Sequence, residues 1–397
     1  MSNKKTPKEE HTIDSLEELN SAGRGTGLEA EADEISQITD VSEPFDPEKI
    51  DVDTRSFTID LLLSRLRYGE LSLQPDFQRR SDLWSDSKQS RLIESIILNI
   101  PLPNLYFSEV SQDDLAVIDG VQRLTTICRF VEHTYGGKYN FQPLILTGME
   151  YLTELNGKAF KDLPRFMQRR ITETQIVVHV IKKQTPKEVK FNIFKRINTG
   201  GLTLSPQEIR NALYSGKARD ILKSMVETKE FLDITEGKIQ SERMGDHEIA
   251  LRFAAFYSNG YKNYSGNNLD AFLMKTMDEL QGLTKKDETA LIKAFKKGLI
   301  NAHKIFGPFA FRKYSGDTRR SPINKSIFEV QVTLCANLTA KQVNSLSKSR
   351  EKILTNLQNS LIEDKTFFNA VTQGTGLKER VINRFSEFEK ILEVKND

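Results

Sequence analysis

The stretch "LAVIDGVQRLTTICRF", residues 115–130, changes its hydrophobic pattern near its middle. Its first half is a short apolar run, which is typical of a buried strand. After Asp119 and Gly120, apolar residues return at the three- and four-residue spacing of a helix with one buried side. The pattern predicts a strand, a tight turn at the glycine and then a helix. It therefore indicates an α+β domain in this part of the chain.

This turn has the features of an anion-binding site. Glycine has no Cβ, so a ligand can approach the backbone closely at Gly120. The first N–H groups of the following helix point to the same place, where a phosphate is a suitable ligand. Arg123 can add a bidentate contact and Gln122 a hydrogen bond, while Asp119 is placed to hold Mg²⁺ or an attacking water. The residues alone also fit a structural turn, with Asp119 capping the helix and Arg123 paired with a surface acid.

Two further clusters contain residue types that bind phosphate. The segment "DFQRR", residues 76–80, places Gln78 and Arg79 in a polar loop. The segment "KRINTGG", residues 195–201, places Asn198 at the end of a predicted helix beside two glycines. Solvated arginines and an ordinary helix end are the structural alternatives for these two clusters.

The charge of the chain is distributed unevenly. The 397 residues carry a formal net charge of +2, but residues 1–50 contain 5 Lys+Arg and 13 Asp+Glu, a net of −8. The remaining residues contain 52 basic and 42 acidic side chains, a net of +10. An acidic segment with few aromatic residues does not bury enough surface to fold alone. We therefore expect residues 1–54 to be a disordered acidic leader.

Patterning divides the rest of the chain in two. Strands and helices mix up to about residue 216, whereas helical patterns alone follow from residue 217 to residue 397. Apolar stretches are too short to span a membrane, and the N-terminus has no secretory signal, so a cytoplasmic protein is expected. Cys128 and Cys335 lie far apart inside apolar patterns and are predicted to be buried thiols.

Several motifs occur together and in order: "QPDFQRRSDLW", "LIESIILNIPLP", "VIDGVQRLTTICRF", "FKRINTGGLTLSPQEIRNAL" and "INKSIFEV". In this combination the chain resembles the domain family that forms the N-terminal part of GmrSD-type modification-dependent restriction enzymes, over about residues 55–340. The resemblance implies a ParB/sulfiredoxin-like fold for residues 55–216, followed by an all-helical domain at 217–397. In that superfamily a glycine-x-x-arginine turn holds nucleotide phosphates, and Gly120 to Arg123 match it. The family signature has glutamine where this chain has Val121.

The resemblance implies a nucleotide-binding module of a phage-defence or restriction system. Catalytic roles fall on Asp119, Gln122 and Arg123, with Asp119 also as the metal ligand. NTP binding falls on Gln78, Arg79, Gly120, Arg123 and Asn198. The implied cofactors are an NTP and Mg²⁺, and whether the NTP is hydrolysed stays open. Many relatives have a His-Asn-His nuclease domain, which the five histidines of this sequence do not form. A separate nuclease subunit is therefore an expected partner.

The alternative is a non-enzymatic DNA-binding or regulatory protein. The basic segment "FRKYSGDTRRSPINK", residues 311–325, would then contact a DNA backbone. A third possibility, DNA nicking in the predicted cleft, requires metal-binding acids in addition to Asp119, and the sequence does not display them. Sulfiredoxin chemistry is excluded because it needs a cysteine within the glycine-x-x-arginine motif.

Overall fold

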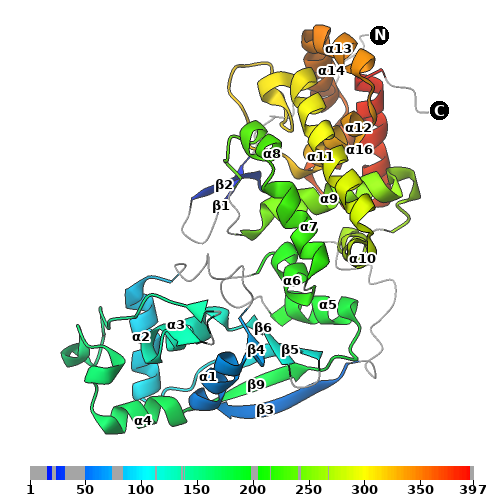
Figure 1. The fold of residues 1–397 in the computed structure, drawn as a ribbon. Coiled ribbons are helices and arrows are strands. Elements are labelled where there is room, and N and C mark those ends of the chain that lie inside the picture. The colour runs from blue at the N-terminus through cyan, green and yellow to red at the C-terminus, as the bar shows by residue number, and fades with distance from the viewer. Residues whose placement is uncertain are drawn as a thin grey trace, which may run out of the picture. The chain divides into compact units, whose positions relative to one another are not determined.

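A computed structural model gives the structure of the chain (Figure 1). It describes residues 16–19, 24–31, 50–73, 84–111, 114–135, 137, 139–197, 204–214, 216–239, 243–266 and 268–393. The chain forms two compact units. The sheet unit is Pro44–Leu213, and the helical unit combines Met1–Glu43 with Tyr214–Asp397. The predicted boundary at 216/217 lies close to this division, but the N-terminal segment groups with the helical unit.

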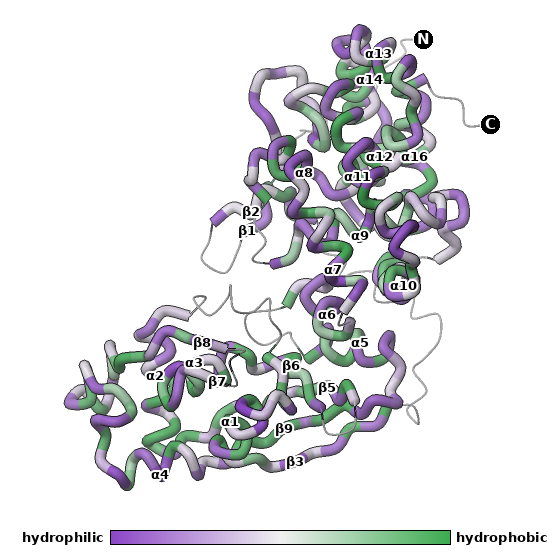
Figure 2. Tube along the Cα trace, in the orientation of Figure 1, coloured by the Kyte–Doolittle hydropathy of each residue, from purple (hydrophilic) through white to green (hydrophobic). Residues whose placement is uncertain are grey.

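The sheet unit is built on one five-stranded mixed sheet. Its strands, in spatial order, are β3 (Val52–Thr58), β9 (Gln175–Ile181), β5 (Leu105–Ser111), β6 (Asp114–Asp119) and β4 (Leu71–Ser72). The pairs β3–β9 and β5–β6 are antiparallel, whereas β9–β5 and β6–β4 are parallel. Figure 2 colours the central strands β9 and β5 mostly as hydrophobic, which fits strands that have neighbours on both sides.

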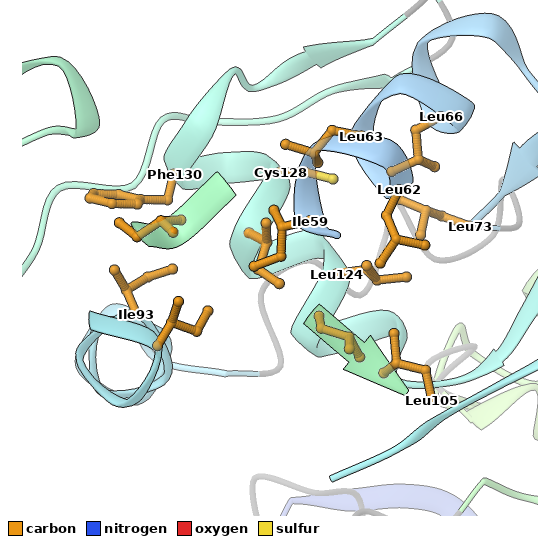
Figure 3. Packing of buried hydrophobic residues seen from close by; sticks show 14 of the residues in the cluster. Ile59, Leu62, Leu63, Leu66, Leu73, Ile93, Leu105, Leu124, Cys128 and Phe130 are labelled. Carbon is orange, nitrogen blue, oxygen red and sulfur yellow. The ribbon is translucent and has the colours of Figure 1, made fainter. Parts of the chain in front are cut away.

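Helices α1 to α4 border the hydrophobic core of this unit. The helices of the sheet unit are α1 (Ile59–Tyr68), α2 (Asp86–Ile97), α3 (Val121–Val131), α4 (Arg165–Glu173), α5 (Lys187–Ile197) and α6 (Pro206–Leu213), and a short hairpin joins β7 (Thr134–Tyr135) to β8 (Tyr139–Asn140). In Figure 3, Leu124 and Cys128 of α3 lie among Ile59, Leu62 and Leu63 of α1. This packing fixes α3, and with it the turn at its start, against the sheet.

Short-range capping determines where several helices begin. The Thr58 hydroxyl accepts the Leu61 N–H at 3.2 Å, so α1 begins directly after β3. The hydroxyl of Ser205 accepts the Glu208 N–H at 3.2 Å, and Glu208 accepts the Ser205 N–H in return. The apolar run at residues 115–119 is confirmed as β6, and the segment "NLYFSEV", residues 104–110, which also predicts a strand, is confirmed as β5. The sequence did not predict β3, whose residues alternate between half-buried and exposed along an edge of the sheet.

The helical unit contains a two-stranded hairpin and ten α-helices in its described part. They are β1 (Glu17–Leu19), β2 (Gly25–Glu29), α7 (Lys217–Val226), α8 (Lys229–Ile234), α9 (Gly245–Asn259), α10 (Leu269–Gly282), α11 (Lys285–Phe306), α12 (Lys325–Asn337), α13 (Ala340–Lys348), α14 (Arg350–Glu363), α15 (Lys365–Thr372) and α16 (Lys378–Ile391). Cys128 of the sheet unit and Cys335 of this unit are both buried, as predicted, and burial raises the pKa of each thiol. In the described residues, no helix has both the length and the apolar character that a membrane crossing needs.

The expectation of a disordered leader is wrong for strand β2, which packs into the helical unit. Leu28 is 1% exposed, and the Glu29 N–H donates to the Ile323 carbonyl at 2.8 Å. The Glu29 carboxylate pairs with the buried Lys313 ammonium at 2.8 Å. The composition of this segment predicted that it could not fold alone. It folds because the helical unit supplies the apolar surface and the cations that the segment itself lacks.

The buried position of Leu28 predicts a stabilising role for this strand. Leu28→Ala removes a fully buried side chain, so the free energy of unfolding of the helical unit should fall by about 2–5 kcal/mol. Leu16→Ala is the matched control, because Leu16 is 82% exposed and its change should stay within about 0.5 kcal/mol. Chemical denaturation of both variants measures the difference, and equal effects would show that the strand does not contribute to the core.

Candidate functional site

The turn between β6 and α3 is centred on Gly120, which has a φ of +98°. Only glycine adopts this left-handed conformation without strain. A Cβ at this position would also lie 2.1 Å from Cδ2 of Leu105. The expectation that the missing Cβ makes room for a ligand is therefore wrong for this direction. The space is filled by Leu105 from the neighbouring strand, and the glycine allows close packing of β5 against the turn.

The side chain of Arg123 connects the turn to the chain before β5. Its Nη2 atom donates to Oδ2 of Asp119 at 2.8 Å and to the carbonyl of Asn104 at 3.2 Å. Its Nη1 atom donates to the carbonyl of Pro103. The Arg123 side chain is 13% exposed, and burial lowers the pKa of Arg123 while the Asp119 carboxylate acts in the opposite direction. Arg123 thus holds the end of β6 and the start of β5 together.

The N-terminus of α3 offers backbone N–H groups beside this ion pair. No side chain of the described residues caps the helix at Gly120. Asp119 does not take that role, because its carboxylate faces Arg123 and remains 38% exposed. The described geometry therefore combines an uncapped helix start, a guanidinium and a partly exposed carboxylate, which are groups that suit a phosphate and a cation.

A row of polar side chains continues from this turn across β5 and β9 to the edge strand β3. Nδ1 of His179 on β9 lies 3.0 Å from the Thr54 hydroxyl on β3, and its Nε2 lies 3.0 Å from the side-chain nitrogen of Asn104. The rings of His179 and Tyr106 have centroids 4.9 Å apart. Strand register aligns Tyr106 with both His179 and Asp119. Hydrogen bonds therefore run without a break from Thr54 through His179 and Asn104 to Arg123.

The sequence did not single out His179, Tyr106 or Asn104 as site residues. The alternating pattern "TQIVVHVIKK" does predict that His179 points to the polar face of a strand. It does not predict which strands lie beside it, and only that register brings the histidine to the segment that Arg123 holds. The signal that could have been used is the placement of Asn104 directly before a predicted strand.

A second arginine of α3 holds the other end of the helix in place. Arg129 is buried, and its Nη1 donates to Asp86 at 3.0 Å and to Oε1 of Gln89 at 2.9 Å, both on α2. Its Nε donates to the carbonyl of Gln142 at 2.8 Å. A buried arginine with three acceptors restricts the orientation of the helix on which it lies. The direction of the α3 N-terminus is therefore set by contacts at both ends.

The other predicted site residues are only partly covered by the structure. Gln122 lies half-buried in the first turn of α3, next to Arg123 in sequence. Gln78, Arg79 and Asn198 lie outside the described residues. Strand β4 runs parallel to β6, so the chain leaves β4 at the same end of the sheet where β6 ends at Asp119. The structure places Asp119, Gly120 and Arg123 together, and a nucleotide-binding role for all of these residues stays a prediction.

The described residues could hold a magnesium ion only together with ligands that do not come from the protein. In the parts of the chain that the structure describes, no cluster of three or more His, Cys, Asp or Glu side chains has metal-binding geometry. Mg²⁺ at nucleotide sites is commonly held by one or two carboxylates together with phosphate oxygens and water. The single carboxylate of Asp119 fits that arrangement. The further acids required for metal-dependent DNA nicking are not found among the described residues.

Much of the positive charge in the basic segment at residues 311–325 is paired within the helical unit, although Arg319 is exposed, and a DNA contact by this segment stays a prediction. Lys313 is buried and forms an ion pair with Glu29. Arg312 is also buried, and its guanidinium donates a hydrogen bond to the carbonyl of Ser321. Arg320 pairs with Glu236, whose pKa is lowered to about 2 by Arg320 and Lys238. Most of the positive charge of this segment therefore stabilises the helical unit itself.

Comparison with sequence families identifies the sheet unit. Residues 59–215 match the family described as the N-terminal domain of the GmrSD restriction endonuclease. This part of the chain therefore carries a domain of the GmrSD type, as the motifs predicted. Comparison with curated proteins gave no match. Comparison with solved structures also gave none.

The contact between Gly120 and Leu105 yields a stability prediction. Gly120→Ala combines a left-handed conformation with a clash in the core, so the sheet unit should lose about 2–5 kcal/mol of unfolding free energy. Gly69→Ala is the matched control, since Gly69 has a φ of +79° but a methyl group added there would meet no other atom within 4 Å. Its cost should be limited to about 1–2 kcal/mol.

A double variant separates strain from packing at this turn. In Gly120→Ala/Leu105→Ala the space occupied by the leucine side chain is empty, so the added methyl group no longer clashes. The two changes together should therefore cost less than the sum of the single changes, as measured by denaturant unfolding. Simple additivity would contradict the packing role assigned to Leu105.

Proposed function

We propose that this protein is a cytoplasmic nucleotide-binding component of a restriction or phage-defence system. The GmrSD-type domain at residues 59–215 supports the class of system. The observation that carries the nucleotide proposal is the N-terminus of α3, which no side chain of the described residues caps, beside the Asp119–Arg123 pair. In this proposal the phosphates of an NTP bind the N–H groups after Gly120 and the guanidinium of Arg123, with Gln122 as a hydrogen-bonding neighbour.

The ion pair supplies a physical reason why nucleotide and Mg²⁺ would bind together. In the free protein each group of the pair satisfies the charge of the other. A phosphate that binds Arg123 leaves the Asp119 carboxylate without its partner. A cation that binds Asp119 likewise leaves the Arg123 guanidinium without its partner. When both ligands bind, both side chains keep an opposite charge nearby. Binding of the nucleotide and of Mg²⁺ should therefore be mutually favourable.

The finer features of the proposal follow from the family resemblance. A ParB/sulfiredoxin-like fold for the sheet unit would place the nucleotide at this strand-to-helix turn. Gln78, Arg79 and Asn198 are proposed as further phosphate or sugar contacts. Asp119 would orient a water molecule if the nucleotide is hydrolysed. A separate nuclease or effector subunit, and DNA, are the partners that a restriction system requires.

Removing the guanidinium tests the phosphate site. Arg123→Ala should weaken NTP binding by about 10- to 100-fold, because charge-assisted hydrogen bonds of about 1.5–3 kcal/mol are lost. Arg67→Ala is the matched control: it removes an arginine that pairs with Glu132 at the opposite end of α3 and should leave binding unchanged. Isothermal titration with ATP, GTP, CTP and UTP, each with Mg²⁺, measures the affinities. If no NTP binds the wild type at millimolar concentration, the proposal is wrong.

A second substitution tests the exchange of partners. Asp119→Asn keeps the size of the side chain but frees Arg123 from its carboxylate. NTP binding without Mg²⁺ should then be equal to or tighter than in the wild type, while the gain in affinity from added Mg²⁺ should disappear. Titrations with Mg²⁺ and with EDTA compare the two proteins. A Mg²⁺-dependent gain that is the same in both would contradict a metal-binding role for Asp119.

A further inference from the structure

A groove in the helical unit lies along α11, the long yellow helix of Figure 1. It has a volume of about 580 Å³ and is lined by residues of α11 and by Ser224 of α7. Its lysines are Lys285, Lys293, Lys296 and Lys297. The groove belongs wholly to the helical unit and contains none of the residues assigned to the nucleotide site. Its chemistry can therefore be considered separately.

Two of these lysines keep an uncompensated charge. Lys296 pairs with Glu230 at 2.8 Å, and Lys285 pairs with Glu288. Lys293 and Lys297 also line the groove, are exposed and have no ion-pair partner among the described residues. Ile292 and Ile300 are further lining residues, and lysine stems can lie along such apolar side chains. The groove thus presents two positive charges that no acidic side chain of the described residues neutralises.

The lysines continue beyond the groove along one side of α11. At 3.6 residues per turn, Lys285, Lys293, Lys296, Lys297 and the exposed Lys304 all fall within about a third of the circumference of α11. The row is about 28 Å long at a rise of 1.5 Å per residue. A compact anion such as inorganic phosphate would contact only part of it. A row of this length instead matches an extended polyanion such as duplex DNA, which presents phosphates along its whole length.

The groove residues also indicate how such a polyanion would be bound. The residues that line the groove, all within the described part of the chain, include no aromatic side chain and no Asn or Gln other than Asn301. Bases are read by stacking on aromatic rings or by bidentate amide and arginine contacts. Lysine and hydroxyl groups instead bind phosphate without regard to sequence.

We infer that the lysine row of α11 binds the phosphate backbone of duplex DNA without sequence preference. This inference does not depend on nucleotide binding at α3. It assigns the DNA contact to the lysines of α11 and not to the basic segment at residues 311–325. It also places a DNA contact in the helical unit, to which no role follows from the match at residues 59–215.

Charge reversal at the centre of the row tests the inference in the full-length chain. Fluorescence anisotropy with a labelled duplex of about 20 base pairs measures the affinity over a series of salt concentrations. Lys293→Glu/Lys297→Glu should weaken binding at least about tenfold at low salt and reduce the slope of log K against log salt by about 2. Both side chains are exposed, so the thermal midpoint should stay unchanged.

The control is a reversal of equal charge elsewhere in the same unit. Lys341→Glu/Lys348→Glu alters two exposed lysines of α13 and should leave the affinity within about twofold of the wild type. Equal loss in the α11 and α13 variants would show a general charge effect and overturn the inference. Tighter binding of single strands, or displacement of the duplex by micromolar triphosphate, would overturn the assignment to duplex DNA.

Discussion

The hydrogen bonds of one guanidinium determine the geometry on which the candidate site depends. Arg123 lies on α3, yet its acceptors are the last residue of β6 and two carbonyls before β5. Because Leu105 packs onto the bare α-carbon of Gly120, the same segment is also held by contact. The helix start cannot move relative to the sheet without breaking both. A phosphate site made of backbone N–H groups needs this rigidity, since its donors have no freedom to follow a ligand.

Local signals in the sequence were sufficient to predict the elements around the site. The apolar run before Asp119 gave β6, and the helical spacing after Gly120 gave α3. Capping residues such as Thr58 and Ser205 are local as well, because the N–H groups that donate to their hydroxyls lie three residues further along the chain. All of these features depend on neighbours within a few positions. That is the range over which a hydrophobic pattern and a capping motif carry information.

The partners within the site could not be predicted in the same way. Arg123 was expected either to bind a ligand or to pair with a surface acid, and the acid proved to be Asp119 of the same turn. Its other acceptors and the leucine that requires Gly120 come from the start of β5, a contact set by strand pairing. His179 reaches Asn104 only because β9 lies parallel to β5. Register between strands is decided by the packing of the whole sheet, which a single strand does not encode.

The charges of the helical unit show why composition alone does not locate a binding surface. Lysine and arginine count equally in a net charge whether they face solvent or a buried carboxylate. Lys313 is held by Glu29 of the acidic N-terminal segment, and Arg252 pairs with Glu31 of the same segment at 3.0 Å. Burial would lower the pKa of Arg252, but Glu31 and its neighbouring carboxylates outweigh that effect and raise it.

The acidic segment therefore neutralises cations inside the unit. A buried cation that keeps its carboxylate partner is unable to attract a distant polyanion, because the opposite charges cancel outside the protein. The positive charge that remains effective at the surface must come from side chains without such partners. Lys293 and Lys297 satisfy this condition, and they lie on a helix whose other face is packed in the core. The pairing of charges within the fold, more than their number, thus determines where the molecule can meet an anionic partner.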